Sequence, residues 1–85
     1  MNDNKVLVEI FVPTIETSFN VFLPINKRVV NIVSLLETAI TDLSDNYYKN
    51  NGNARLYNNS TGLPYDDKLV LKETDIRNGS KLIMF

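Results

Sequence analysis

The stretch LKETDIRNGSKLIMF, residues 71–85, decides the fold class, because it joins a tight turn to an alternating strand. The dipeptide Asn-Gly at 78–79 is typical of such turns, since glycine adopts a positive φ at little steric cost. After the turn, Leu82 and Met84 lie at a spacing of two, the period of a strand with one buried face. We therefore expect a strand over Ser80–Phe85.

Two similar alternations lie in the first third of the chain. The first covers Lys5–Val12, where every second residue is a β-branched apolar one, and it stops at Pro13, which cannot donate to a ladder. The second covers Ser18–Leu23 and stops at Pro24. The two runs predict a β-hairpin.

The apolar period changes between Lys27 and Asp45. There the apolar residues fall at helical spacing, which predicts an amphipathic helix of about four turns. Asn26 precedes this segment and is the expected N-cap. The apolar positions of the helix are Val29, Ile32, Val33, Leu36, Ala39, Ile40 and Leu43.

Two short segments complete the secondary structure. We expect strands at Arg55–Tyr57 and Lys68–Val70, separated by the turn-rich segment 58–67, so that the order is β-β-α-β-β-β. A single helix in such a chain can bury its apolar stripe only by lying across one face of the sheet. This predicts an α+β fold with a mixed sheet of four to five strands, and we expect the first and last strands at its centre.

Size and charge limit the classes of function. A chain of 85 residues forms one domain, here 1–85, of which we expect residues 1–4 to be disordered. The net charge of -1 gives no basic surface for nucleic acid. The apolar run at 6–12 is too short and too polar for a signal peptide or a membrane span. We expect a cytoplasmic protein that binds no nucleic acid and does not insert into membranes.

The residue inventory also disfavours enzyme chemistry. The chain has no cysteine and no histidine, which removes thiol and imidazole catalysis and Cys/His zinc sites. Asp66 and Asp67 are adjacent in a turn but lack the further ligands that a hard cation needs. We expect no catalytic residue, metal or cofactor, and a function that resides on a surface.

The order and spacing of the elements resemble the β-grasp fold of ubiquitin over essentially the whole chain. Within that superfamily, the chain is similar to the YukD/EsaB-like ubiquitin-like proteins of type VII secretion loci in Gram-positive bacteria. Two motifs carry the likeness, a basic helix start after Leu-Pro and an ending of the form I-x-N-G-x-x-L. Their residues here are Leu23, Pro24, Lys27, Arg28, Ile76, Asn78, Gly79 and Leu82.

This resemblance implies a non-enzymatic accessory or adaptor protein of a type VII secretion system. Its implied partners are cytosolic parts of the membrane ATPase of that system or another membrane component. Ubiquitin and the related sulfur carriers act through a flexible tail that ends in Gly-Gly, whereas this chain has glycine only at 52, 62 and 79. We therefore expect no conjugation.

The same resemblance and the period of two predict a docking surface on the sheet face away from the helix. Its expected members are Phe11, Phe22, Tyr57, Ile83 and Phe85. Contiguous exposed apolar patches with aromatic anchors tend to mark partner sites. The alternative is that long loops cover these side chains, or that one strand is shifted by a residue and turns them inward.

Three other readings stay open from the sequence. The protein could be a carrier or modifier activated at its C-terminus, a homodimer that uses the same sheet face, or a partner for strand addition at a sheet edge. Two local features have structural interpretations. We expect Lys27 and Arg28 to be a solvated pair, and Tyr47 and Tyr48 to cover the end of the core beneath the helix.

Overall fold

The computed structural model describes residues 4–50 and 52–85. It contains four strands and one helix: β1 (Lys5–Val12), β2 (Thr17–Pro24), α1 (Val29–Leu43), β3 (Leu56–Asn58) and β4 (Lys81–Met84). Single 3-10 turns lie at Pro13–Ile15 and Leu71–Glu73. We expected disorder at residues 1–4, of which residues 1–3 lie outside the described residues. The carbonyl of Asn4 accepts a hydrogen bond from the amide of Ile25 at 2.9 Å.

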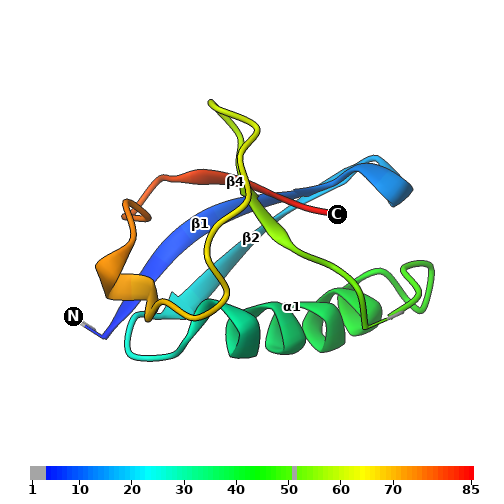
Figure 1. The fold of residues 1–85 in the computed structure, drawn as a ribbon. Helices are drawn as coiled ribbons and strands as arrows, with labels where there is room; N and C mark the ends of the chain where they lie inside the picture. Colours follow the sequence, from blue (N-terminus) through cyan, green and yellow to red (C-terminus); the bar gives the residue numbers. More distant parts are fainter. Residues whose placement is uncertain (1–3, 51) are drawn as a thin grey trace.

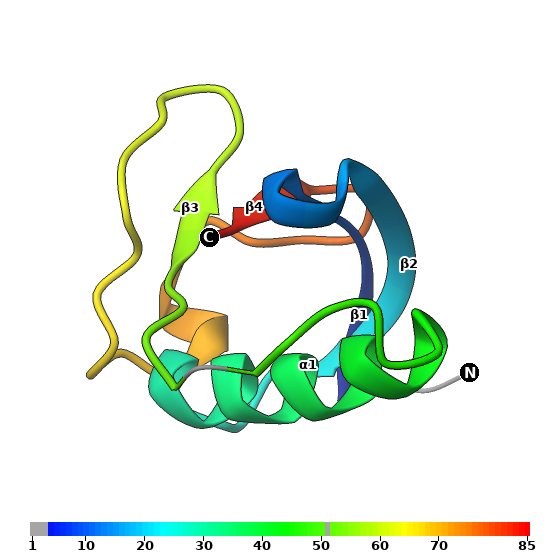
Figure 2. The ribbon, with the colours of Figure 1, turned by 90° about the vertical axis from the view of Figure 1, so that its right-hand side faces the viewer.

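The sheet has the strand order β2-β1-β4-β3, and α1 lies across one of its faces (Figures 1 and 2). β1 pairs antiparallel with β2 and parallel with β4, and β3 pairs antiparallel with β4. The first and last strands therefore occupy the centre, as predicted. Because both are rich in apolar residues without an internal proline, they tolerate burial along both edges.

The expected strand at Lys68–Val70 is wrong. Only Val70 takes part in pairing, through an isolated antiparallel bridge with Arg28. The carboxylate of Asp66 accepts the amide of Lys68 at 2.9 Å, which holds this segment as a turn. The 3-10 turn then starts at Leu71. The sheet consequently has four strands, and the order of elements along the chain is β-β-α-β-β.

The start of α1 also differs from the expectation. Arg28, not Asn26, occupies the N-cap position, and it makes no side-chain capping bond. Instead, the amides of Val29 and Val30 donate to the carbonyls of Leu69 and Asp67 at 2.8 and 3.1 Å. The 67–69 backbone thus satisfies helix donors that a capping side chain would otherwise serve.

The core lies between α1 and the sheet. Ile32, Leu36 and Ile40 of the helix are buried, and the inward residues of the strands meet them. Val6, Phe19 and Val21 are partly buried at the margin of this core. The fully buried strand residues are Val8, Ile10, Val12, Leu56, Leu82 and Met84. This is the face that the period of two assigned to the helix, so the opposite face carries the predicted docking residues.

Candidate functional site

Three of the predicted docking residues form a row across the open face of the sheet. Phe11 on β1 is in register with Ile83 on β4, and Ile83 is in register with Tyr57 on β3. Residues in register on neighbouring strands have their side chains side by side on one face. Phe85 follows Ile83 by two positions and is 64% exposed. We call Phe11, Tyr57, Ile83 and Phe85 the open-face cluster.

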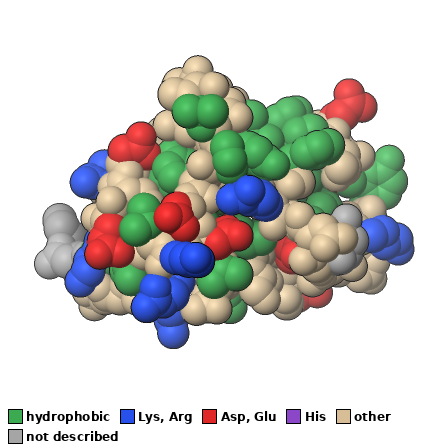
Figure 3. Space-filling model, in the orientation of Figure 1, with side chains coloured by type: hydrophobic (Ala, Val, Ile, Leu, Met, Phe, Trp, Pro, Cys, Tyr) green, Lys and Arg blue, Asp and Glu red, His purple; other side chains and the backbone are tan. Residues whose placement is uncertain are grey.

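A shallow apolar hollow of about 320 Å³ lies over this cluster. It is lined by Tyr57, Ile83 and Phe85 together with Pro13 and Gly62. Hydrophobic side chains gather in this region, between the projecting loop after β3 and the β1–β2 turn (Figure 3). The sequence interpretation missed Pro13, although its spacing of two from Phe11 would have found it. Nothing in the sequence indicates Gly62, because its loop folds back through tertiary contacts.

The structure does not bring Phe22 into the cluster. Phe22 is in register with Leu7, and the two side chains are 65% and 41% exposed. A polar row separates them from the open-face cluster. That row consists of Asn20, Glu9 and Lys81, in register on β2, β1 and β4. The predicted surface is thus two apolar patches and not one.

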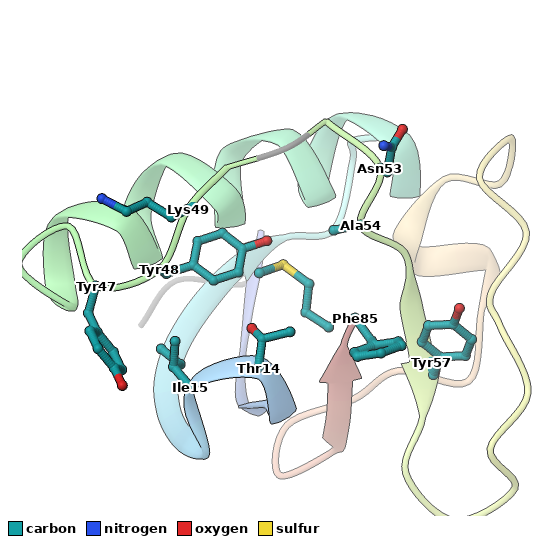
Figure 4. A pocket seen from close by; sticks show the side chains of 10 residues that line it. Thr14, Ile15, Tyr47, Tyr48, Lys49, Asn53, Ala54, Tyr57 and Phe85 are labelled. Atoms are coloured by element: carbon teal, nitrogen blue, oxygen red, sulfur yellow. The ribbon is translucent and has the colours of Figure 1, made fainter.

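A larger hollow, of about 620 Å³, opens between the segment after α1 and the ends of the strands (Figure 4). Tyr57 and Phe85 line one side of the hollow, and Tyr48 lines it beneath α1. The open-face cluster and this hollow therefore share two aromatic side chains. The lining residues that the sequence did not suggest are Thr14, Ile15, Lys49, Asn53 and Ala54.

The two neighbouring tyrosines of this hollow have different environments. Tyr48 is buried, as expected, and its hydroxyl donates to Oε2 of the buried Glu37 at 2.8 Å. Burial first, and then the Glu37 carboxylate, raises the pKa of Tyr48 far above its ordinary value. Tyr47 is 72% exposed, so the expectation that both rings cover the core is wrong for Tyr47. The chain direction after α1, where Asp45 and Asn46 adopt positive φ, turns only one ring inward.

Arg28 and Asp67 make contacts within the fold, so the expectation of a solvated pair at residues 27 and 28 is wrong for Arg28. The guanidinium of Arg28 donates to the carbonyl of Lys68, while Lys27 is exposed. Asp67 lies 4.0 Å from Nε of Arg55 at the surface. Across the part of the chain that the structure describes, no three His, Cys, Asp or Glu side chains gather as metal ligands would.

The comparisons with known proteins concern the fold. The ubiquitin-like domain of the Mycobacterium tuberculosis type VII secretion protein EccD1 matches with a TM-score of 0.75 and 12% identity, over 94% of this chain and 96% of that domain. The chain has the ubiquitin-like β-grasp fold. The ubiquitin-like domain of yeast Ddi1 matches this fold with a TM-score of 0.69 and 13% identity, over 99% of this chain and 91% of that chain.

A third match lies within a larger assembly, the MycP5-free ESX-5 inner membrane complex. The TM-score is 0.71 and the identity 18%, over 96% of this chain but only 21% of the matched one. The ubiquitin-like chain thus spans about a fifth of that protein. No protein-family profile and no curated protein matches the sequence. Among the described residues, no helix has the length and hydrophobicity to cross a bilayer.

Proposed function

We propose that this protein is a non-enzymatic, non-conjugated ubiquitin-like accessory module of a bacterial type VII secretion system. It belongs with the YukD/EsaB-like proteins of Gram-positive bacteria and acts in the cytoplasm. Its work is to dock a protein partner, which is the membrane ATPase or another membrane component of the system. The fold likeness to the EccD1 domain and to a part of the ESX-5 inner membrane complex supports this assignment.

The observation that carries the proposal is the open-face cluster. Phe11, Ile83 and Tyr57 are in register on three strands. Among the described residues, no helix or strand lies over the face of the sheet opposite α1 (Figure 2). Phe85 adds a ring that is mostly exposed beside them. An aromatic and aliphatic patch with a shallow hollow suits the apolar anchor of a partner, because burying such rings dominates interface energetics.

The backbone of Phe85 pairs with that of Arg55. Its amide donates to the carbonyl of Arg55 at 3.0 Å, and the amide of Arg55 donates back to the Phe85 carbonyl at 2.9 Å. Both bonds hold residue 85 against the segment before β3. This pairing holds Phe85 in the open-face cluster.

Affinity capture from the native host, read by mass spectrometry, tests the docking. We expect the protein to recover a secretion ATPase or its membrane partners. Tyr57→Asp and Ile83→Asp should abolish this recovery while the protein stays folded by circular dichroism. Leu35→Asp is the matched control, because Leu35 is an exposed apolar residue on α1, outside the cluster. Full recovery by folded Tyr57→Asp and Ile83→Asp variants would refute the docking surface.

Intact-mass analysis of the protein from its host separates the proposal from the rival carrier function. The non-conjugated module should have the mass of the unmodified chain. A covalent adduct, or recovery of an adenylating enzyme in the affinity capture, would overturn the non-conjugated role, although the assignment of the fold would still hold.

A further inference from the structure

The outer edge of β2 is the free edge of the sheet. In the strand order β2-β1-β4-β3, β2 is terminal, and within the described residues nothing pairs with its outer side. The other terminal strand is covered instead. There the carbonyl of Leu56 accepts the amide of Tyr65, and the amide of Asn58 donates to the carbonyl of Leu63, both at 2.9 Å. Within residues 4–50 and 52–85, the outer edge of β2 is therefore the one edge available for a further strand.

The hydrogen bonds of β1 show which groups of β2 point outward. The carbonyl of Leu7 accepts a hydrogen bond from the amide of Gly79, and the amide of Glu9 donates to the carbonyl of Ser80. Leu7 and Glu9 therefore direct their backbone groups toward the β4 side. In an antiparallel pair, when one residue directs its N–H and C=O away from the partner strand, the residue opposite also directs its N–H and C=O away. Phe22 and Asn20 are opposite Leu7 and Glu9. With the period of two, Ser18, Asn20 and Phe22 carry the outward donors and acceptors.

This edge lacks the devices that usually block pairing. Natural edge strands are protected by charged side chains, bulges, prolines or short length. β2 has eight residues, its sequence TSFNVFLP contains no charge, and its one proline is the last residue. Its partner β1 pairs with it over the full eight residues without a bulge. The edge is long, regular and uncharged, which is what a pairing strand requires.

We propose that two copies of this protein pair through their β2 edges, antiparallel and centred on Asn20. Asn20 of each copy is then opposite Asn20 of the other, and Ser18 is opposite Phe22. All three positions direct backbone groups outward, so every pair forms two hydrogen bonds, about six in all. No charged residue lies in the paired segment, so no like charges oppose each other.

The pairing explains why an exposed Phe22 is separated from the open-face cluster within one copy. Ser18 is in register with Phe11 on β1, and Phe11 with Ile83 on β4. In the pair, Phe22 of the second copy lies beside Ser18, on the same face, at the end of that row. The continuous row is then Tyr57, Ile83, Phe11 and Ser18 of one copy, followed by Phe22 and Leu7 of the other. The second copy thus supplies the apolar residue that completes the row.

Cysteine cross-linking tests both the pairing and its register, because the chain has no cysteine of its own. In a hydrogen-bonded antiparallel pair the Cα atoms are about 5.5 Å apart, within the range of a disulfide. We expect the Asn20→Cys variant to form a covalent dimer on mild oxidation. The Ser18→Cys variant should not, because Ser18 residues of the two copies lie about 13 Å apart along the strands. A mixture of Ser18→Cys and Phe22→Cys proteins should cross-link between the two kinds.

Sedimentation equilibrium measures the dimer without a cross-link. We expect the unmodified protein to dimerise in a concentration-dependent way, and Asn20→Lys to weaken the dimer at least about tenfold through two facing charges. Asn31→Lys, the same change at an exposed position of α1, is the matched control and should have no effect. A monomer at all concentrations would overturn the proposal. A dimer that Asn20→Lys does not weaken, and that does not cross-link through Asn20→Cys, would overturn the proposal, because the copies would then pair through another surface.

Discussion

Ile10 and Phe11 are neighbours on β1, yet they belong to two regions with opposite physical demands. Ile10 points toward α1 and is 0% exposed, whereas Phe11 lies half-buried on the open face with Ile83 beside it. The covered face of the sheet contacts a helix, while no helix or strand of the described residues lies over the open face (Figure 2). Alternate residues of the same strands thus have different tasks: the inward ones stabilise the fold, and the outward ones form the surface that we propose docks a partner. Substitutions that alternate along a strand should therefore separate the two properties.

The largest expected effect comes from the covered face. Ile10→Ala should lower the free energy of unfolding by about 2–5 kcal/mol, because it removes buried methylene groups and leaves a cavity. Phe11→Ala is the matched control on the open face and should cost clearly less, since solvent already reaches its ring. Urea denaturation followed by circular dichroism measures both. Equal losses for the two variants would show that the two faces contribute equally to stability.

The second effect concerns a polar group inside the covered layer. Glu37→Ala should destabilise the protein by about 1–3 kcal/mol, because the buried Tyr48 hydroxyl loses its acceptor. Glu37→Gln is the control, since an amide oxygen can still accept this hydrogen bond. The same denaturation experiment compares them. If both variants lose the same stability, neither the stem, which Gln keeps, nor an acceptor oxygen as such accounts for the loss, and the charged carboxylate does.

A charge on the open face should have a smaller effect on folding and a large one on binding. Ile83→Asp exchanges a half-buried β-branched residue for a poor strand former, which costs about 1 kcal/mol. Leu82→Asp, one residue earlier on the covered face, should prevent folding, because its carboxylate would be buried without a partner. Thermal unfolding followed by circular dichroism compares the two. An unfolded Ile83→Asp variant would contradict the separation of stability from recognition.

The smallest effect lies at the β3 margin of the sheet, where Tyr65 donates to Asp75 at 2.8 Å. Partial burial first, and then this carboxylate, raises the pKa of Tyr65 to about 12. The folded state thus keeps a proton that the unfolded state releases near pH 10, so the contribution to stability is complete below pH 10 and is lost as the pH rises toward 12.

Replacing this tyrosine tests the assignment. Tyr65→Phe should cost about 0.5 kcal/mol at neutral pH, at the low end for a hydrogen bond because the site is only partly buried. Its stability should also fall less steeply than that of the unmodified protein between pH 10 and 12. Urea denaturation across this range measures the difference. Parallel pH profiles for the two proteins would show that Tyr65 does not titrate as described.

Much of the fold and part of the site follow from local sequence. The alternation in 5–12 assigned Ile10 inward and Phe11 outward, and the Asn-Gly turn at 78–79 placed the last strand. These predictions succeeded because the direction of a side chain on a strand or helix depends on its own period, which the chain carries locally. The same reasoning placed Phe11, Tyr57, Ile83 and Phe85 on the open face, where the structure brings them together.

Strand register and long-range contacts do not follow from local sequence. The periods gave Phe22 the correct face, but pairing with Leu7 put it beyond the polar row of Glu9, outside the cluster. The carbonyls of 67–69 cap α1 in place of Asn26, and their segment forms a turn where a strand was expected. The register of β2 and the capping of α1 depend on which backbone groups from distant parts of the chain come into contact. A local sequence pattern carries no information about those distant groups. The local period determined which way the strand side chains face, because that direction depends on the chain itself, whereas the packing of the whole chain determined which side chains are neighbours.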